Sequence, residues 1–125
     1  MATIREDGFP QANTVEYVND GVTIYFATDP HSQKIKNIKF CEKVSLAIEE
    51  DYPDWMKIKG VQLGGSAEVL IKKEEIARVQ KLYLDKFPFV ANFPLSDIVF
   101  CQVTPKIIYF LDYEKGFDHR DIIEN

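Results

Sequence analysis

The sequence predicts a mainly β fold: a small antiparallel barrel of six to seven strands with two helices added. Three observations support this fold class. Most candidate strands are short and rich in β-branched and aromatic residues, tight turns join them, and only two segments have helical spacing. Closing so many short strands into a barrel removes exposed strand edges, which otherwise pair with other chains.

The chain is long enough for one domain. It has 125 residues, of which 46% are hydrophobic and 28% are charged, and this composition is typical of globular proteins. A domain of this size buries roughly two-thirds of its unfolded surface, so it needs neither metal nor disulfides to fold. We therefore expect a single domain over residues 1–125.

The first quarter of the chain predicts an antiparallel meander of three strands. The expected strands cover residues 2–5, 9–18 and 22–27. Turns at residues 6–8 and 19–21 separate them, and an Asp-Gly pair in such a turn is a strong hairpin signal. The three strands are therefore expected to lie side by side in chain order.

The rest of the chain continues the barrel and supplies the helices. One helix is expected to begin at Ser32 as its N-cap, and the second to cover residues 74–87. Gly64 and Gly65, inside an expected strand, indicate a bulge, a bend, or a close approach by another backbone or a ligand. The remaining strands are expected at residues 44–48, 58–70, 98–103 and 107–113, with a loop at 49–57 and a polar tail at 114–125.

Charge and cysteine content argue against several classes of function. The net charge of −5 disfavours a general nucleic-acid binder, which needs a basic face. Cys41 and Cys101 lie far apart without a Cys-His cluster, so we expect two buried thiols and no metal site. No apolar run approaches the ~20 residues that span a membrane. These features predict a cytoplasmic protein without nucleic-acid or membrane partners.

A candidate binding segment covers residues 25–40, where an expected strand, a polar turn and a helix start follow one another. The first N–H groups of a helix lack internal partners, and the helix dipole favours negative charge there. Thr28 and Ser32 add hydroxyl donors, and Lys34 adds a cation. We therefore expect a phosphate group to bind at this segment.

The lysines around this segment have two interpretations. Lys34, Lys36, Lys39 and Lys43 form a local positive region in an acidic protein. They can serve a small anionic ligand, or they can be the solvated face of a helix. We expect Lys34 to contact the anion and the other three to be surface charges.

Several short motifs occur in an order that points to a known family. They are DGFPQ after the first strand, YFAT at the end of the third, S-x-K at the helix start, KVSLAIE and GVQLGGSAEVL in the middle, and VTPKIIYFLDY near the end. Together, over residues 2–113, they resemble the pyridoxamine 5'-phosphate oxidase-like family of FMN-binding split barrels. The resemblance implies a homodimer with FMN at the subunit interface and an oxidoreductase acting on a small molecule.

The resemblance also implies which residues hold the cofactor. Thr28, Ser32 and Lys34 would bind the phosphate, in agreement with the helix-end chemistry. Gln62 corresponds to a position from which the partner subunit reaches the ring or the ribityl chain. The family's second strand runs beside the isoalloxazine ring, and its residues here are Gln11, Ala12, Asn13 and Thr14.

These residues also have simpler interpretations. Thr28 and Ser32 can be only a strand end and a helix cap, and Asn13 and Gln62 can be ordinary polar residues of strands. Trp55, in the acidic loop, can cover the flavin or line a substrate pocket, or it can pack against the barrel or the dimer partner.

No catalytic residue is predicted, because the cofactor of a flavoprotein performs the redox step itself. His31 lies in the expected phosphate turn and His119 in the tail, and neither is in a pattern typical of a general base. The oxidase proper binds its substrate phosphate with several arginines. Arg5, Arg78 and Arg120 do not align with that role, so the expected substrate is a different small molecule.

Three functions therefore stay open. The first is an FMN-dependent oxidoreductase, and the second is a flavin carrier or sensor without turnover. In the third, the barrel binds a deazaflavin or haem, as relatives with this fold do. Haem needs an axial ligand, and a deazaflavin favours a longer basic groove than one group of lysines offers, so FMN is the cofactor we expect.

Overall fold

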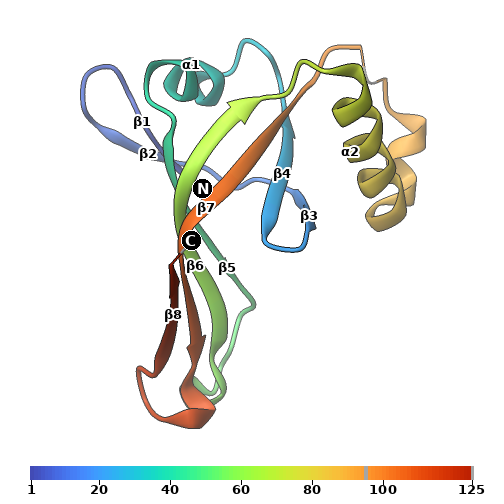
Figure 1. Ribbon diagram of the computed structural model, residues 1–125. Coiled ribbons are helices and arrows are strands. Elements are labelled where there is room, and N and C mark those ends of the chain that lie inside the picture. Colours follow the sequence, from blue (N-terminus) through green and yellow to red (C-terminus); the bar gives the residue numbers. More distant parts are fainter. Residues whose placement is uncertain (95, 125) are drawn as a thin grey trace.

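The computed structural model describes residues 1–94 and 96–124. In this part of the chain, eight strands form one antiparallel sheet, and two α-helices pack against it (Figure 1). The expected mainly β fold class is confirmed. The strands are β1 (Ala2–Ile4), β2 (Pro10–Ala12), β3 (Tyr17–Asp20), β4 (Thr23–Thr28), β5 (Lys43–Glu49), β6 (Lys59–Val69), β7 (Val99–Asp112) and β8 (Arg120–Glu124); the helices are α1 (Gln33–Phe40) and α2 (Lys73–Lys86).

The long strands β6 and β7 form the centre of the sheet. The strand order is β2-β1-β5-β6-β7-β4-β3, and β8 pairs with the C-terminal half of β7. Over the described residues, β2 and β3 end this order without pairing with each other, so the sheet curls into a barrel that is split rather than closed.

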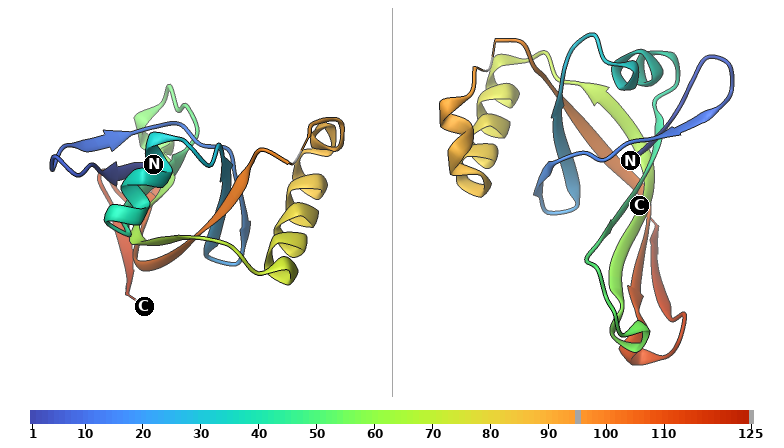
Figure 2. Two further views of the ribbon diagram at one scale, coloured as in Figure 1. Left: turned by 90° about the horizontal axis from the view of Figure 1, so that it is seen from above. Right: turned by 180° about the vertical axis from the view of Figure 1, so that it is seen from behind.

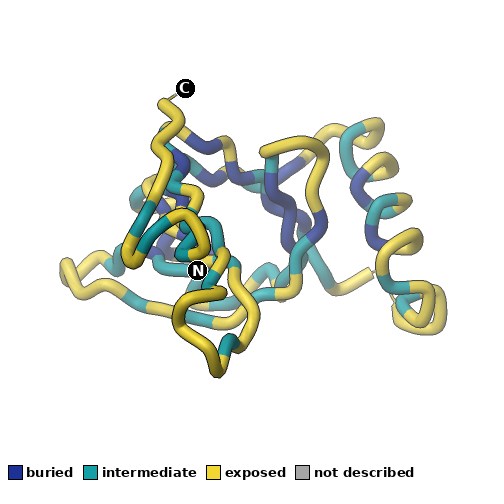
Figure 3. The backbone as a smooth tube through the Cα atoms, turned by 90° about the horizontal axis from the view of Figure 1, so that it is seen from below, coloured by how far each residue is buried: buried dark blue, intermediate teal, exposed yellow. Residues whose placement is uncertain are grey.

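Apolar side chains fill both sides of the curled sheet. The main core cluster lies inside the barrel and includes Phe26, Leu46 and Val103. A second cluster, which includes Val79 of α2, lies between the sheet and that helix. In Figure 3 the buried positions accordingly follow the inner strands and one side of α2. Figure 2 shows α1 above the barrel and α2 beside it.

Strand β7 runs unbroken from Val99 to Asp112, whereas two strands joined at residues 104–106 were expected, and that prediction was wrong. Pro105 lacks a backbone N–H and normally interrupts a sheet. Here it lies opposite Gly65, where the β6–β7 register shifts between Gly64 and Gly65. The extra residue at this shift is Lys106, so the bulge lies in β7 beside the proline, and both strands continue.

The expected three-strand meander was also wrong, because its second strand is divided. β2 pairs with β1, while β3 pairs with β4 at the other end of the strand order. Asn13 still exchanges backbone hydrogen bonds with Met1, at 2.9 and 2.7 Å. Val15 and Tyr17 then pack against the barrel core. The burial of these two side chains stabilises the connection that crosses from β2, at one edge of the sheet, to β3, at the other.

The polar tail forms an unexpected strand. Strand β8 pairs with residues 107–111 of β7, and a short 3-10 turn at Tyr113–Lys115 precedes it. Residues 47–62 and 107–124 together form a β-arm that extends beyond the barrel (Figure 1). Two further 3-10 turns, Trp55–Lys57 and Pro88–Asn92, occur in expected loops.

Both cysteines are free thiols, as expected, but only Cys101 is buried, because Cys41 is partly exposed at the end of α1. Cys101 is buried in β7, and burial raises its pKa to about 12. Neither helix in the described part of the chain has the length and apolar character needed to cross a membrane.

The bulge predicts opposite outcomes for two neighbouring glycines. A Cβ on Gly65 would overlap the β7 backbone, including Pro105 Cα at 2.9 Å, whereas a Cβ on Gly64 would only touch Ile107 Cγ2 at 3.5 Å. Gly65→Ala should therefore lower the free energy of unfolding by at least ~2 kcal/mol. Gly64→Ala is the matched control and should change it by less than ~1 kcal/mol. Urea denaturation measures both; equal values would contradict the close approach.

Candidate cofactor site

The turn between β4 and α1 places two hydroxyls at the helix N-terminus. Ser32 is the N-cap: its Oγ accepts a hydrogen bond from the Ile35 N–H at 3.4 Å and another from the Thr28 hydroxyl at 3.2 Å. Because the Ser32 oxygen already accepts two bonds, its own proton is available to donate. The first two N–H groups of the helix, on Gln33 and Lys34, also have no acceptor within the helix. These donors together favour an anion.

Lys34 differs from its neighbours in its surroundings. Its side chain is half-buried, whereas Lys36 and Lys39 are exposed. The pKa of the Met1 amine is lowered, first by burial and then by the charge of Lys34. The same charge acts on Cys101 inside the barrel. The Lys34 charge therefore acts on groups at the start of β1 and inside the barrel.

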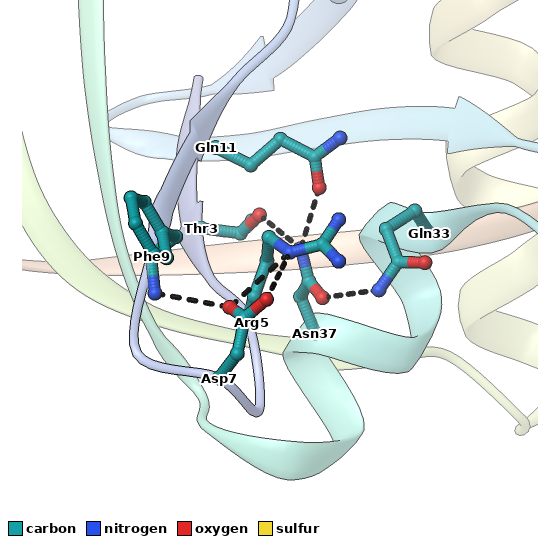
Figure 4. A network of polar contacts seen from close by, with 7 residues as sticks. All are labelled: Thr3, Arg5, Asp7, Phe9, Gln11, Gln33 and Asn37. Atoms are coloured by element: carbon teal, nitrogen blue, oxygen red, sulfur yellow. Dashed lines mark hydrogen bonds and ion pairs between the residues drawn. The ribbon is translucent and has the colours of Figure 1, made fainter.

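A buried polar network joins α1 to strands β1 and β2 (Figure 4). The Asn37 amide nitrogen donates to Thr3 Oγ1 and to Gln11 Oε1, both at 3.0 Å, and Gln33 Nε2 donates to Asn37 Oδ1 at 2.8 Å. Thr3 and Asn37 are each only 1% exposed. The network sets the position of α1 relative to the edge strand β2.

Sequence analysis did not identify Thr3 or Asn37. The available signal was the Gln33–Asn37 pair, whose spacing of four residues puts both amides on one side of a helix. Asn37 adjoins Ile38, which is buried, so an amide on the inner side of the helix could have been suspected.

The outer face of the sheet carries a shallow depression of about 480 Å³. Small side chains form part of its floor, because two neighbouring cross-strand rows include alanine, serine and glycine beside larger residues. One row consists of Ala12, Ala2, Ser45, Gly64 and Ile107, and the next of Ala47, Gln62 and Tyr109. A flat wall of small residues leaves room for a planar group.

The structure brings together only some of the expected site residues. Thr28, Ser32 and Lys34 form one group at the start of α1, and the Asn37 network connects Gln11 to that helix. Ala12 and Gln62 line the depression. The backbone of Asn13 is bonded to Met1, and Thr14 is exposed in the connection that follows β2.

Trp55 lies away from this group within one chain. It is 68% exposed and begins a 3-10 turn at the end of the β-arm. There the Tyr113 N–H donates to the carbonyl of Ile58 at 2.9 Å. Trp55 precedes β6 in the chain. Lys59, the first residue of β6, is already five residues from Gly64 on the floor of the depression, which is roughly 17 Å along a strand.

The two histidines lie outside the depression. His31 is exposed in the β4–α1 turn, where its backbone N–H donates to Asp29 Oδ1 at 2.7 Å. His119 Nε2 lies 3.2 Å from Asp121 Oδ1 in the connection before β8. Hydrogen bonds from Lys115 and His119 lower the pKa of Asp121. Among the described residues, no group of three or more His, Cys, Asp or Glu side chains is arranged to hold a metal ion.

Comparison with known families agrees with this architecture. The family model described as pyridoxamine 5'-phosphate oxidase matches residues 1–112. The chain belongs to this family. The expected resemblance is thereby confirmed, and the match covers both the α1 N-terminus and the strands around the depression. A comparison with curated protein sequences finds no significant match.

Several solved structures share the family fold. A haem-binding protein from Mycobacterium smegmatis has a TM-score of 0.81 at 21% identity, over 98% of this chain and 50% of that chain. A conserved hypothetical protein from Mycobacterium tuberculosis has a TM-score of 0.80 at 24% identity, and the match covers 99% of this chain and 82% of that chain. An FMN-binding, pyridoxamine 5'-phosphate oxidase-related protein from Nostoc punctiforme has a TM-score of 0.69 at 12% identity, and the match covers 99% of this chain and 78% of that chain. This chain thus spans half the length of the first protein.

The Ser32 cap can be tested without a ligand. Ser32→Ala removes the acceptor for the Ile35 N–H and should lower the free energy of unfolding by about 1 kcal/mol. Ser32→Asp keeps a capping oxygen and should stay within ~0.5 kcal/mol of the unsubstituted protein. Chemical denaturation followed by circular dichroism measures both. Equal stability of all three proteins would show that the cap does not support α1.

Proposed function

We propose that this protein binds FMN and uses it as an oxidoreductase on a small organic molecule, as a homodimer. The observation that carries the proposal is the group of donors at the start of α1: two hydroxyls, free helix N–H groups and the half-buried Lys34. Family membership and an FMN-binding structural neighbour support the choice of cofactor.

The donor group suits a phosphate monoester. The proton of Ser32 and the N–H groups of the first helical turn can donate to phosphate oxygens, and the helix dipole favours the negative charge. Lys34, which is half-buried, adds a full positive charge. Partial burial strengthens its attraction to an anion, because water screens it less. Lys36 and Lys39, which are exposed, are not part of the proposed site.

The ring end of FMN would lie along β2 and the outer face of the sheet. Ala12 and the neighbouring small residues leave space for a planar ring at the outer face beside β2. Gln11 reaches the same edge of the sheet from the other face of β2, where it contacts Asn37 of α1, and Asn13 and Thr14 follow along the chain. Bound FMN supplies hydride or single-electron transfer, while the protein binds and orients it. The chain contributes position and hydrogen bonds, and we assign it no acid or base.

A homodimer would complete the proposed site. The depression lies open on the sheet face, and Gln62 on its floor is exposed. A second copy packed on this face would exclude water from the ring. The exposed Trp55 would have to come from that second copy, because one chain keeps it on the β-arm. Two free thiols suit a reducing compartment, so we propose a cytoplasmic protein.

Haem is the second candidate, because a structural neighbour is a haem-binding protein. Haem iron takes an axial ligand such as histidine. His31 and His119 lie at opposite ends of the sheet, away from the depression, and His119 is paired with Asp121. FMN and a deazaflavin need no such ligand. The group at α1 contains one half-buried lysine, which suits the short phosphate end of FMN.

FMN binding is expected at micromolar or lower concentration, with a yellow purified protein that releases FMN on denaturation. Lys34→Ala should weaken FMN binding about tenfold or more, because it removes a charge-assisted contact. Lys36→Ala is the matched control on the exposed side of α1 and should bind normally. Ser32→Asp should fold but repel the phosphate.

Fluorescence titration with FMN measures these affinities. A colourless protein that does not bind FMN, or a Soret band in the absorbance spectrum, would contradict the proposed cofactor. Equal losses of FMN affinity in the Lys34 and Lys36 variants would show that the phosphate does not bind at this group.

Turnover separates an oxidoreductase from a flavin carrier or sensor. We expect a nicotinamide donor to reduce the bound flavin, and a small organic acceptor to accelerate its reoxidation in a saturable manner. Stopped-flow absorbance at the flavin band follows both steps. Reoxidation that no acceptor accelerates would favour a carrier or sensor.

A further inference from the structure

We infer that Asn37 is a positioning residue that fixes the amide of Gln11, so that Gln11 offers a hydrogen-bond donor to the bound cofactor. The inference rests on the proposed function and adds a specific role for the buried network. Asn37 itself would not touch the cofactor, because it is 1% exposed between α1 and β1.

All three polar groups of the Asn37 side chain are used inside the protein. Its nitrogen donates twice, to Thr3 Oγ1 and Gln11 Oε1, and its oxygen accepts from Gln33 Nε2. In the structure the Asn37 oxygen faces the Gln33 NH₂ group and its nitrogen faces Thr3 and Gln11; reversing Asn37 alone would place donor against donor at Gln33. Asn37 therefore presents N–H, and not oxygen, to strand β2.

This orientation determines the orientation of Gln11. The Gln11 oxygen accepts the Asn37 hydrogen bond at 3.0 Å, so its NH₂ group points away from α1, as Figure 4 shows. Gln11 lies in the edge strand β2 and is half-buried. The oxygen of the Gln11 amide is therefore hydrogen-bonded inside the protein, and its NH₂ group is left to bond elsewhere. This NH₂ group is the donor.

A donor at this position suits a flavin ring. The pyrimidine edge of the ring carries two carbonyl oxygens, which accept hydrogen bonds, on either side of an N–H, which donates; the proposed contact of Gln11 is with a carbonyl oxygen, and such bonds tune the electronics of the flavin. With the amide reversed, Gln11 would turn an oxygen toward these acceptors and repel them. Asn37 thus determines whether Gln11 presents a donor or an acceptor to the ring. The donors at the start of α1 make a separate contact, with the phosphate of the cofactor.

Two substitutions reverse the outward group by different routes. Asn37→Asp conserves volume but only accepts, so Gln11 must turn its NH₂ inward and its oxygen outward. Gln11→Glu keeps an oxygen for Asn37 and places a second oxygen outward. Each should weaken FMN binding about tenfold. Gln102→Glu, the same change on the distant strand β7, is the control and should leave FMN affinity unchanged.

A double-substitution cycle separates positioning from a structural role. In a Gln11→Ala background, Asn37→Asp should cause little further loss of FMN affinity, because its effect acts through Gln11. Additive losses would show that Asn37 only supports the fold, and would overturn the inference. Thermal unfolding of each variant identifies those that fail to fold. If Asn37→Asp fails to fold, Gln11→Glu still tests the inference, because Gln11 lies on an edge strand.

Side-chain amide exchange by NMR tests the orientation without a cofactor. In the unsubstituted protein, the Asn37 NH₂ protons should exchange slowly and the Gln11 NH₂ protons quickly. Slow exchange at Gln11 would overturn the inference. Failure of the unsubstituted protein to bind FMN would instead overturn the proposed function, whereas normal FMN binding by both Asn37→Asp and Gln11→Glu would overturn this inference alone.

Discussion

The pairing of β6 with β7 is the constraint on which the rest of the structure depends. It runs from Lys59–Asp112 to Val69–Cys101, and β5, β4 and β8 all attach to one of these two strands. The pairing continues past Pro105 only because Gly65, opposite it, has no side chain. One glycine thus allows a single ladder to support both the barrel and the β-arm.

The ladder also separates the two parts of the candidate site. The outer rows of small residues on β5 and β6 form the floor of the depression, while α1 packs above the barrel against β1 and β6. The Asn37 network ties α1 to β1 and β2, so hydrogen bonds connect the helix that carries the Ser32 donor group to the strand that carries Ala12. A cofactor that spans both would contact residues far apart in the sequence.

Local rules predicted the elements well and their partners less well. The Ser32 cap, helix α2 and the hairpin turn before β4 follow from side-chain chemistry within a few residues, and the structure has all three. The division of the second strand, the unbroken β7 and strand β8 depend on distant partners. Pro105 illustrates the difference, because alone it predicts a break, and only the facing Gly65 removes it. Tail residues such as Ile122 form a strand because β7 leaves an edge for them.

The sequence by itself determined the fold class, the family and the group of Thr28, Ser32 and Lys34, because these depend on contiguous motifs and on the chemistry of one helix end. Only the tertiary structure decided which small residues share the outer face of the sheet, and that Asn37 is hydrogen-bonded to Thr3 and Gln11. The two Asn37 hydrogen bonds join residues separated by 26 and 34 positions in the chain. Sequence spacing carries no direct information about such contacts, because they exist only after the strands have paired.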